Sequence, residues 1–409
     1  MNKIGIITSA FYPSTGAGCR RITYLIKYLL KKNIKVYLFT TNADYLYSFN
    51  QNDQEIPQIL DHKNLMIYRF PGFLFNENFN FKYHPKRIFN KFIRKYIFWD
   101  TKLDWGMYAH EKINRLIKEN NIKTIFSSAP CFSSHYISYK IKKENKNLFW
   151  VMDMRDPWVD NEYFKFNIWQ KKIIKKYEKL FFNTADEITV ISKYLKEKYK
   201  NKYNIKSIHT IYNGFDSYKN NNKVSSKENK FLICYTGTLY EERKSALLKF
   251  IEELSNIISK NIFEFDIKFI YAGKLDNITK NKINDKLGDK FKYLGFVSLE
   301  KSIHLQNKAN MLLLPIGKEW EMTSKVFEYM KTHNPIYCIM KEYNKELVDI
   351  INNTKTGKCF LYDEKENLKN FLVNIDDINK NINTEKIKKY DYENLTDQLL
   401  NIIDNGQKN

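Results

Sequence analysis

Cysteine is scarce in this chain. Five cysteines occur among 409 residues, scattered, odd in number and without C-x-x-C spacing, at Cys19, Cys131, Cys234, Cys338 and Cys359. This pattern supports neither a disulfide framework nor a zinc site, and it is typical of a protein kept in a reducing compartment. The cysteines therefore favour the cytoplasm.

Long apolar runs are absent as well. No run approaches the roughly 18 residues that a membrane span needs. Residues 1–8 lead directly into a strand pattern, without the basic region, apolar stretch and cleavage site of a signal peptide. We therefore expect a cytoplasmic protein whose contact with any membrane is peripheral, at the inner face.

Acidic residues are outnumbered by basic ones. Lys and Arg total 68 against 46 Asp and Glu, which gives a net charge of +22 and a pI of about 9.4. Such a chain favours anionic partners: nucleic acid, phosphorylated small molecules or an acidic membrane surface. An AT-rich genome, which enriches Lys and Asn, is an equally good explanation of part of this excess, so charge alone does not select the partner.

The chain does contain enough apolar surface for two domains. It is 43% hydrophobic with 29 Tyr and 29 Phe, which indicates a globular protein. Short apolar runs alternate with amphipathic segments, the pattern of an α/β fold. The predicted strands are residues 4–8, 36–40, 66–70, 124–126, 149–152 and 188–191, then 231–235, 266–271, 291–294, 311–315 and 335–339.

A polar, aperiodic stretch at 217–230 separates the two strand series and indicates a linker or exposed loop. We therefore predict two Rossmann-like, doubly wound domains that face each other across a cleft, residues 1–212 and 213–389. A C-terminal amphipathic helix in residues 390–409 is expected to cross back to the first domain. Ligands of such sheets bind outside the carboxyl ends of the strands.

Three helix starts, each after a predicted strand, carry cations. The cations and the small residues before them are Gly16, Gly18, Arg20 and Arg21, then Gly237, Thr238, Arg243 and Lys244, then Thr323, Ser324 and Lys325. A cation at a helix N-terminus costs about 0.3–1 kcal/mol unless an anion is present. One glycine loop alone more often only turns the chain, but a diphosphate held between the domains explains all three starts.

Glu328 follows Lys325 among apolar neighbours. It lies four and five residues after Ser324 and Thr323, whereas a capping-box glutamate lies three residues after its cap. A buried salt bridge to a lysine is one explanation. The other is a ligand, because a carboxylate that accepts two hydrogen bonds suits the vicinal hydroxyls of a ribose.

Eight motifs in order resemble one family over nearly the whole chain. They are the start "FYPSTGAGCRRITYLIKYLLKKNIKVYLFTTN", "SSAPCFSSHYI", "WVMDMRDPW", "ADEITVISKYL", "IYNGFD", "YTGTLY", "YLGFVS" and "KVFEYMKTHNPI". They resemble GT-B glycosyltransferases, specifically the family 4-like enzymes of bacterial surface-polysaccharide assembly. The resemblance implies a hexosyl-type transferase that acts in the synthesis of capsule, lipopolysaccharide O-antigen or exopolysaccharide.

The resemblance also implies roles for the site residues. The second domain would bind a UDP- or GDP-sugar and the first a saccharide or lipid-linked acceptor, with no metal and no cofactor. Lys244 would bind the diphosphate and Glu328 the ribose. The loop from Gly16 to Gly18 would close on the phosphates, and the turn 323–325 would lie near the diphosphate and donor sugar. The expected reaction retains anomeric configuration, and phosphate-binding cations stabilise the leaving diphosphate.

The sequence departs from the family pattern at several positions. Thr238 stands where the family has an arginine, and Arg243 is expected to substitute for it. The first glutamate of the family's two-glutamate motif falls on Trp320, so its neighbour Glu321 is expected to orient the donor sugar, with Glu319 as the other option.

Three residues of the first domain are catalytic candidates. Arg155 and Asp156 lie at a motif where many relatives have a histidine near the arginine. For Asp156, a role as a loop cap before Pro157 is an equally good explanation. His135, at the start of a predicted helix, is expected by analogy to face the cleft, although a lone histidine is more often structural.

Basic helices suggest a membrane contact. Residues 84–99 place aromatic and aliphatic side chains on one side and cations on the other, as at an anionic membrane, but an ordinary core-packed helix fits equally well. Lys171, Lys172, Lys175 and Lys176 form a second basic cluster.

Other functions compete with this interpretation. A nucleic-acid-binding protein would suit the net charge, but the charge is spread over both halves and no nucleic-acid motif occurs, so we expect no nucleic-acid partner. A GT-B-fold sugar-nucleotide epimerase or phosphorylase is the second alternative.

Overall fold

The computed structural model describes residues 1–12, 16–42, 59–72, 99–100, 102–161, 165–216, 230–364 and 367–408. The chain divides into two compact units, which we name unit 1 (Met1–Tyr212 with Tyr392–Asn409) and unit 2 (Asn213–Asp391). The polypeptide therefore passes between the units twice, after Tyr212 and after Asp391. The sequence-based division was 1–212 with 390–409, and 213–389.

Unit 1 is built on a seven-stranded parallel sheet in the order β3-β2-β1-β4-β5-β6-β7. Most of its strand residues are buried, which explains why they form apolar runs rather than an alternating pattern. The strands are β1 (Lys3–Ile7), β2 (Lys35–Thr41), β3 (Leu65–Phe70), β4 (Thr124–Ser128), β5 (Phe149–Met154), β6 (Glu187–Val190) and β7 (Ile208–Thr210).

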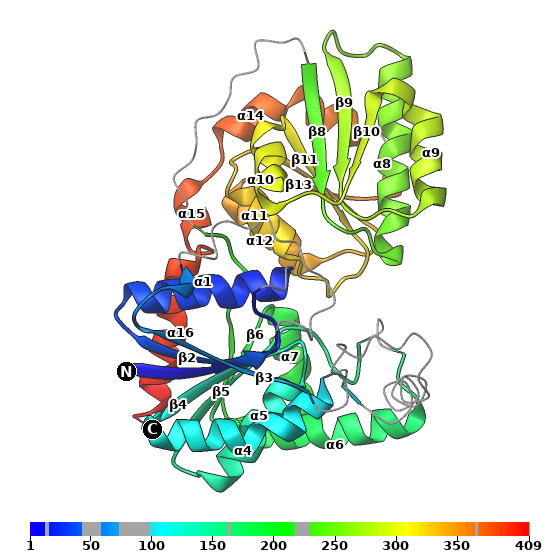
Figure 1. The fold of residues 1–409 in the computed structure, drawn as a ribbon. Helices are drawn as coiled ribbons and strands as arrows, with labels where there is room; N and C mark the ends of the chain where they lie inside the picture. The colour runs from blue at the N-terminus through cyan, green and yellow to red at the C-terminus, as the bar shows by residue number, and fades with distance from the viewer. Residues whose placement is uncertain are drawn as a thin grey trace, which may run out of the picture. The chain divides into compact units, whose positions relative to one another are not determined.

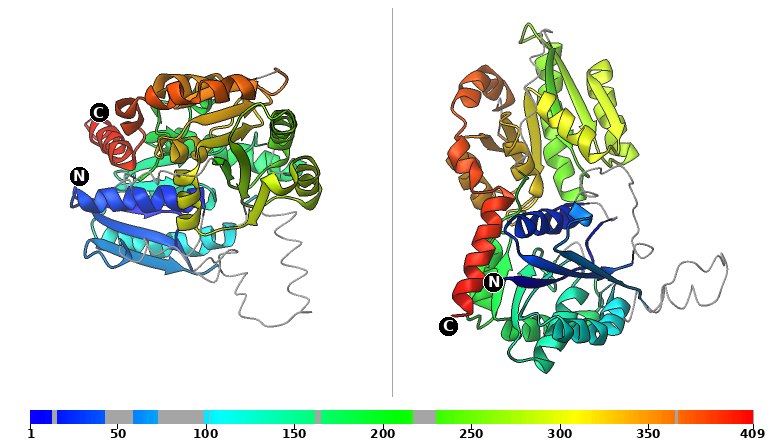
Figure 2. Two further views of the ribbon diagram at one scale, coloured as in Figure 1. Left: turned by 90° about the horizontal axis from the view of Figure 1, so that it is seen from above. Right: turned by 60° about the vertical axis from the view of Figure 1, so that its left-hand side comes forward.

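Helices cover both faces of this sheet (Figure 1). α1 (Ala17–Lys31) and the C-terminal α16 (Tyr392–Gly406) pack together on one face, and α4 (Leu103–Glu119), α5 (Ser133–Glu144) and α6 (Ile168–Thr184) lie on the other. α7 (Lys193–Lys202) packs beside β6 and β7. Figure 2 shows α16 alongside α1 from two further directions, with both chain termini in unit 1. The predicted C-terminal helix therefore does return to the first sheet.

Unit 2 repeats the architecture with six parallel strands in the order β10-β9-β8-β11-β12-β13. The strands are β8 (Lys230–Thr236), β9 (Asp266–Ala272), β10 (Phe291–Gly295), β11 (Met311–Ile316), β12 (Ile336–Met340) and β13 (Gly357–Leu361). The helices are α8 (Glu241–Ser259), α9 (Asn277–Leu287), the 3-10 turn Gly288–Lys290, α10 (Leu299–Lys308), α11 (Ser324–Met330), α12 (Lys345–Thr354), α13 (Asn367–Val373), α14 (Ile375–Lys380) and α15 (Thr384–Lys388).

The predicted α/β fold class is confirmed, because both sheets are parallel and doubly wound. All eleven predicted strands are present within a few residues of their expected ends, and β7 and β13 were missed. β7 has only three residues, and four of the five residues of β13 are partly or fully exposed, so neither forms an apolar run. Residues 217–229 of the predicted connector at 217–230, and residues 84–98 of the predicted basic helix at 84–99, lie outside the described residues.

Within the described ranges, no helix is long and apolar enough to cross a membrane.

Candidate sites at the carboxyl edges of the two sheets

In unit 1 the glycine loop after β1 meets the loop after β5. Gly16 precedes α1 with φ of 130°, a conformation that favours glycine. A Cβ atom built on Gly18 would lie 2.7 Å from Nη1 of Arg155, so only glycine lets the guanidinium approach this closely. Two predicted site elements far apart in the sequence are therefore neighbours at the start of α1.

Arg155 is a buried cation at this edge. Its side chain is 6% exposed, and its Nε has no hydrogen-bond partner among the described residues. Burial lowers the pKa of Arg155, and the charge of Asp156 opposes that shift. Burial raises the pKa of Asp156, and Arg155 opposes it. A buried guanidinium with an unused N–H beside a helix N-terminus favours an anionic ligand.

Asp153, which the sequence analysis did not single out, organises the centre of unit 1. It is fully buried at the end of β5 and accepts two hydrogen bonds from Arg21, Nε to Oδ2 at 3.1 Å and Nη2 to Oδ1 at 2.8 Å. It also accepts hydrogen bonds from the hydroxyls of Ser128 and Thr189, at 2.7 and 2.8 Å. A charged residue inside the apolar run "WVMDM" was the available signal.

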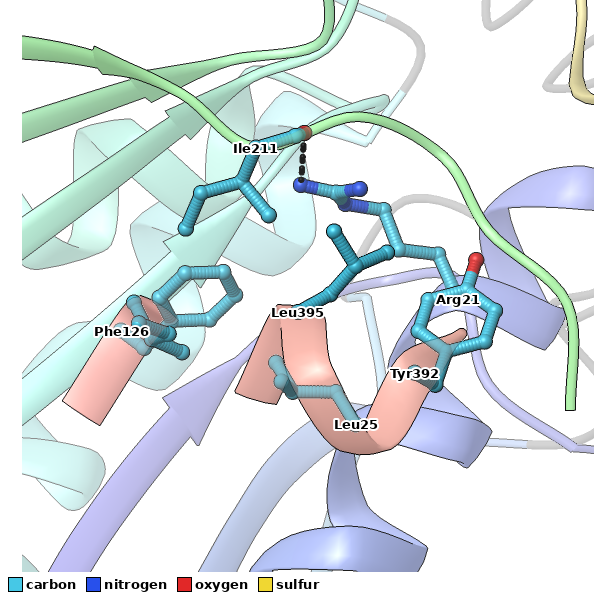
Figure 3. A pocket seen from close by; sticks show the side chains of 7 residues that line it. Arg21, Leu25, Phe126, Ile211, Tyr392 and Leu395 are labelled. Carbon is cyan, nitrogen blue, oxygen red and sulfur yellow. Dashed lines mark hydrogen bonds between the residues drawn. The ribbon is translucent and has the colours of Figure 1, made fainter. Parts of the chain in front are cut away.

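This network changes the interpretation of Arg21, which was expected on the acceptor or phosphate side. Arg21 is 4% exposed and donates to the carbonyls of Tyr212 and Ile211 at 2.7 and 3.1 Å, besides its bonds to Asp153. Figure 3 shows its guanidinium directed to the Ile211 carbonyl, with the Tyr392 ring beside the Arg21 side chain. Arg21 therefore anchors the chain where it leaves unit 1, while its neighbour Arg20 is half-buried.

The pocket drawn in Figure 3 belongs to the same structural centre. Arg21, Leu25, Phe126, Ile211, Tyr392, Leu395 and Leu399 line it. Apart from Arg21 and Tyr392, the lining is aliphatic or aromatic, and it lies where α16 packs on α1. The pocket therefore fits a packing space under α16 better than a sugar site.

His135 was expected by analogy to face the cleft, and its complete burial contradicts this expectation. Its side chain has no exposed surface and contacts the rings of Phe132 and Phe181. Trp150 Nε1 donates to the Ser127 hydroxyl, which lies 2.8 Å from His135 Nδ1. Burial lowers the pKa of His135 to about 3, so the ring is neutral at physiological pH. His135 is a core residue.

In unit 2 two glycines shape the edge formed by β8, β9 and β10. Gly237 and Gly273 have φ of 141° and 150°, and the Gly237 N–H donates to the Ala272 carbonyl at 2.8 Å. A Cβ on Gly273 would lie 1.8 Å from the Gly237 carbonyl oxygen, and one on Gly237 would lie 3.2 Å from Cε of Lys325. The loops therefore pack closely, and Lys325 lies against the Gly237 turn.

Tyrosine hydroxyls hold this turn in place. Tyr271 donates to the Gly237 carbonyl at 3.3 Å, and Tyr235 donates to the Thr238 carbonyl at 3.2 Å. The hydroxyl of Tyr329, on α11, accepts from the Thr236 N–H at 3.0 Å. Thr238, where the resemblance implies an arginine, therefore lies in a firmly supported backbone segment.

Arg243 and Glu321 form a buried ion pair, so neither is an exposed ligand group here. Glu321 Oε1 accepts from Arg243 Nε at 2.7 Å and from Arg243 Nη2, and Oε2 accepts from the Gly317 N–H at 2.9 Å. Burial lowers the pKa of Arg243, but Glu321 outweighs it and the net shift is upward. The pair joins the first turn of α8 to the segment before α11. Of the two glutamates beside Trp320, Glu321 is buried and Glu319 exposed.

Lys244 lies in the first turn of α8, not just before the helix as predicted. α8 begins at Glu241, so two carboxylates precede the cations Arg243 and Lys244. Lys244 Nζ lies 2.5 Å from Glu241 Oε2 and 3.0 Å from Asp276 Oδ2. The argument from a misplaced cation is therefore weaker for α8 than the sequence indicated.

Lys325 and Glu328 form an ion pair on α11. Lys325 Nζ lies 2.7 Å from Glu328 Oε2, the Ser324 hydroxyl donates to Oε1 at 3.2 Å, and the Thr323 hydroxyl accepts from the Lys325 N–H. Both side chains keep some exposure, 14% and 16%. The salt bridge that the sequence left open is therefore present, and the ribose contact stays a prediction.

Comparison with known proteins finds a matching family and similar solved structures. Residues 19–218 match the family model described as Glycosyltransferase Family 4. No curated protein matches the chain. The predicted resemblance to GT-B glycosyltransferases is confirmed by this match and by the fold.

Three solved structures illustrate the fold. A glycosyltransferase from Rickettsia africae is 14% identical with a TM-score of 0.62, covering 100% of this chain and 98% of that one. HepE of Anabaena, in complex with UDP-glucose, is 13% identical with a TM-score of 0.64, covering 98% and 99%. A protein of Listeria monocytogenes described as a UDP-N-acetylglucosamine 2-epimerase is 13% identical with a TM-score of 0.59, and the match covers 100% of this chain and 97% of that one.

Proposed function

We propose that this chain, a GT-B-fold protein whose residues 19–218 match family 4 glycosyltransferases, transfers a hexosyl group from a nucleotide-sugar to a saccharide or lipid-linked acceptor. The proposed setting is the synthesis of capsule, O-antigen or exopolysaccharide on the cytoplasmic side of the membrane. The proposed reaction needs no metal and retains anomeric configuration.

The Lys325–Glu328 pair beside the Gly237 turn carries this proposal. It lies at the carboxyl edge of the unit 2 sheet, where such folds bind ligands. The two opposite charges match the two ends of a nucleoside diphosphate: Lys325 would turn to the diphosphate and Glu328 to the ribose hydroxyls. The pair keeps both charges compensated until the donor replaces their mutual contact.

Lys244 would supply a second cation to the diphosphate. It forms ion pairs with the exposed Glu241 and Asp276, which water can solvate when the lysine moves. Arg243 and Glu321 act differently, because both are buried and already joined. They would position the start of α8 relative to the segment before α11, so that Lys244 and Lys325 face one ligand.

In unit 1, Arg155 and the loop from Gly16 to Gly18 would bind an anionic group of the reacting molecules. The unused Nε of the buried Arg155 and the N-terminus of α1 both favour negative charge. Asp156 would contact the acceptor, since a carboxyl whose pKa is raised by burial suits proton transfer.

The donor assignment is tested by thermal stabilisation with UDP-, GDP- and other nucleotide-sugars, followed by transfer assays. Lys244→Ala and Glu328→Ala should each abolish transfer and reduce the stabilisation by the donor, with little change in Tm of the free protein. Lys249→Ala is the matched control, because Lys249 forms an exposed i,i+3 pair with Glu252 on the same helix. Full activity in both site variants would refute the assignment.

The epimerase-like neighbour makes sugar-nucleotide epimerisation the second candidate. An epimerase converts the sugar nucleotide without any acceptor, whereas a transferase releases nucleoside diphosphate in proportion to glycosylated acceptor. Product analysis by mass spectrometry and NMR in the absence of acceptor separates the two.

A further inference from the structure

The outward side of α6 exposes apolar side chains that the proposed chemistry does not use. Ile168 is 74% exposed, Trp169 is 72% exposed and Ile173 is 37% exposed. Ile168 and Trp169 form the first turn of the helix, and Ile173 lies four residues after Trp169. A large exposed aromatic next to an exposed isoleucine costs hydration free energy unless something covers it.

The same side of the helix is strongly basic. The exposed lysines of residues 165–179 are Lys165, Lys171, Lys172, Lys175, Lys176 and Lys179. The acidic residue of α6, Glu178, is fully buried and bound to Lys202 at 2.8 Å. Within residues 165–179 the exposed surface therefore carries cations and no carboxylate, and Lys172 Nζ lies 5.2 Å from the Trp169 ring centre.

Helical geometry places the two kinds of side chain together. At about 100° per residue, Lys172 and Lys176 lie close to Ile168 and Trp169 around the helix axis. The buried residues Gln170, Ile174 and Phe181 occupy the opposite side, which faces the core of unit 1. We name the exposed set Ile168, Trp169, Ile173, Lys172 and Lys176 the α6 face.

The α6 face starts at the carboxyl edge of the unit 1 sheet. The chain leaves β5 at Met154, passes Arg155 and Asp156, and begins α6 at Ile168. A capping box fixes this start: Asn167 Oδ1 accepts from the Gln170 N–H at 2.8 Å, and Gln170 Oε1 accepts from the Asn167 N–H at 3.0 Å. Ile168 and Trp169 are therefore held in the first turn of α6, which follows β5 and the Arg155–Asp156 segment in the chain.

We infer that the α6 face is a docking surface for an anionic lipid bilayer. Lysines that surround exposed apolar side chains match the interface of such a membrane, where acyl chains accept the apolar groups and head groups the cations. A nucleic acid would pair with the lysines and stack on Trp169, but it offers no apolar layer for Ile168 and Ile173. The inference depends on the proposed function in one respect: docking at the membrane would bring a lipid-linked acceptor to this edge.

Vesicle binding of the full chain tests the inference. The probes are phosphatidylcholine vesicles and vesicles of equal parts phosphatidylcholine and phosphatidylglycerol, measured by co-sedimentation. We expect binding to the anionic vesicles, and a loss of at least about tenfold in affinity in the double variant Ile168→Ser, Trp169→Ser, because each large apolar side chain contributes at least that factor when buried. Lys172→Gln with Lys176→Gln should weaken binding to anionic vesicles and flatten its salt dependence.

Matched controls lie elsewhere on the chain. Ile278→Ser removes an isoleucine of similar exposure, 71%, from α9, and Lys118→Gln with Lys123→Gln removes two exposed lysines at the end of α4 and before β4. Both controls should bind vesicles as the wild type does. Acyl chains brominated near the head group should quench Trp169, and the Trp169→Phe variant should lose that component.

The outcomes separate the inference from the proposed function. No binding to anionic vesicles, or equal binding by the Ile168→Ser, Trp169→Ser variant, would overturn the docking surface. Binding to a single-stranded oligonucleotide that depends on Lys172 and Lys176, with none to vesicles, would assign the face to nucleic acid instead. Stabilisation by a nucleotide-sugar is read separately in each variant, so either proposal can fail while the other stands.

Discussion

Substitution of Asp153 by alanine should destabilise unit 1 severely. Asp153 is fully buried and accepts two hydrogen bonds from Arg21 and one each from Ser128 and Thr189. Asp153→Ala leaves the Arg21 guanidinium, itself 4% exposed, without its counter-charge. Breaking a buried ion pair from one side typically costs about 3–5 kcal/mol.

The loss would consume much of the stability of an ordinary domain, which totals about 5–15 kcal/mol. Arg21→Met combined with Asp153→Leu should recover part of it, because both buried charges are then removed. Recovery stays partial, since the carbonyls of Ile211 and Tyr212 lose their donor.

Urea unfolding followed by tryptophan fluorescence is the assay. Five of the six tryptophans lie in unit 1, and only Trp320 lies in unit 2, so the signal reports mainly on unit 1. The control is Asp397→Ala, which removes the partly exposed pair between Lys32, at the end of α1, and Asp397 of α16; the two side chains are 30% and 48% exposed. That pair should contribute less than about 1 kcal/mol.

The pH dependence gives a second check. Burial raises the pKa of Asp153, but the charge and hydrogen bonds of Arg21 outweigh it, so the net pKa lies below the ordinary 3.8. Its stabilisation is therefore complete above that value and is lost as pH falls through the lower, folded-state pKa. A loss in Asp153→Ala no larger than that in Asp397→Ala, at neutral pH, would refute the reasoning.

Two further predictions concern unit 1. The pKa of His135 falls from 6.5 to about 3 on folding, so between these values the unfolded chain binds a proton that the folded chain does not. As the pH falls below 6.5, the unfolding free energy of the wild type should therefore decrease by up to about 1.4 kcal/mol per pH unit more than that of His135→Gln. Urea unfolding of both proteins from pH 8 to 5 measures this, and an equal pH dependence of the two unfolding free energies would contradict it. Gly18→Ala should displace Arg155 and lower transfer by about tenfold or more while donor-induced stabilisation persists, and unchanged kcat/KM would show that the contact is unimportant.

Sequence alone was sufficient for the fold class because the information is local. Apolar runs such as residues 311–315 and the repeat in α1 reflect burial of whole strands and of one helix side, and they led to all eleven predicted strands. β7 and β13 were missed because short or partly exposed strands leave no such run. The glycines before α1 and α8 were also identifiable, because positive φ restricts the choice of residue.

Only the tertiary structure decided which charges are available. Arg21 and Arg243 resemble Lys325 in the sequence, yet each is buried against a carboxylate distant in the chain, Asp153 and Glu321. His135 likewise lies in the core rather than at a site. Chain order identifies a residue's neighbours along one helix or strand, and therefore its periodicity. Its long-range partner depends on how sheets and helices pack, and that partner determines whether a charge holds the fold together or stays available to a ligand.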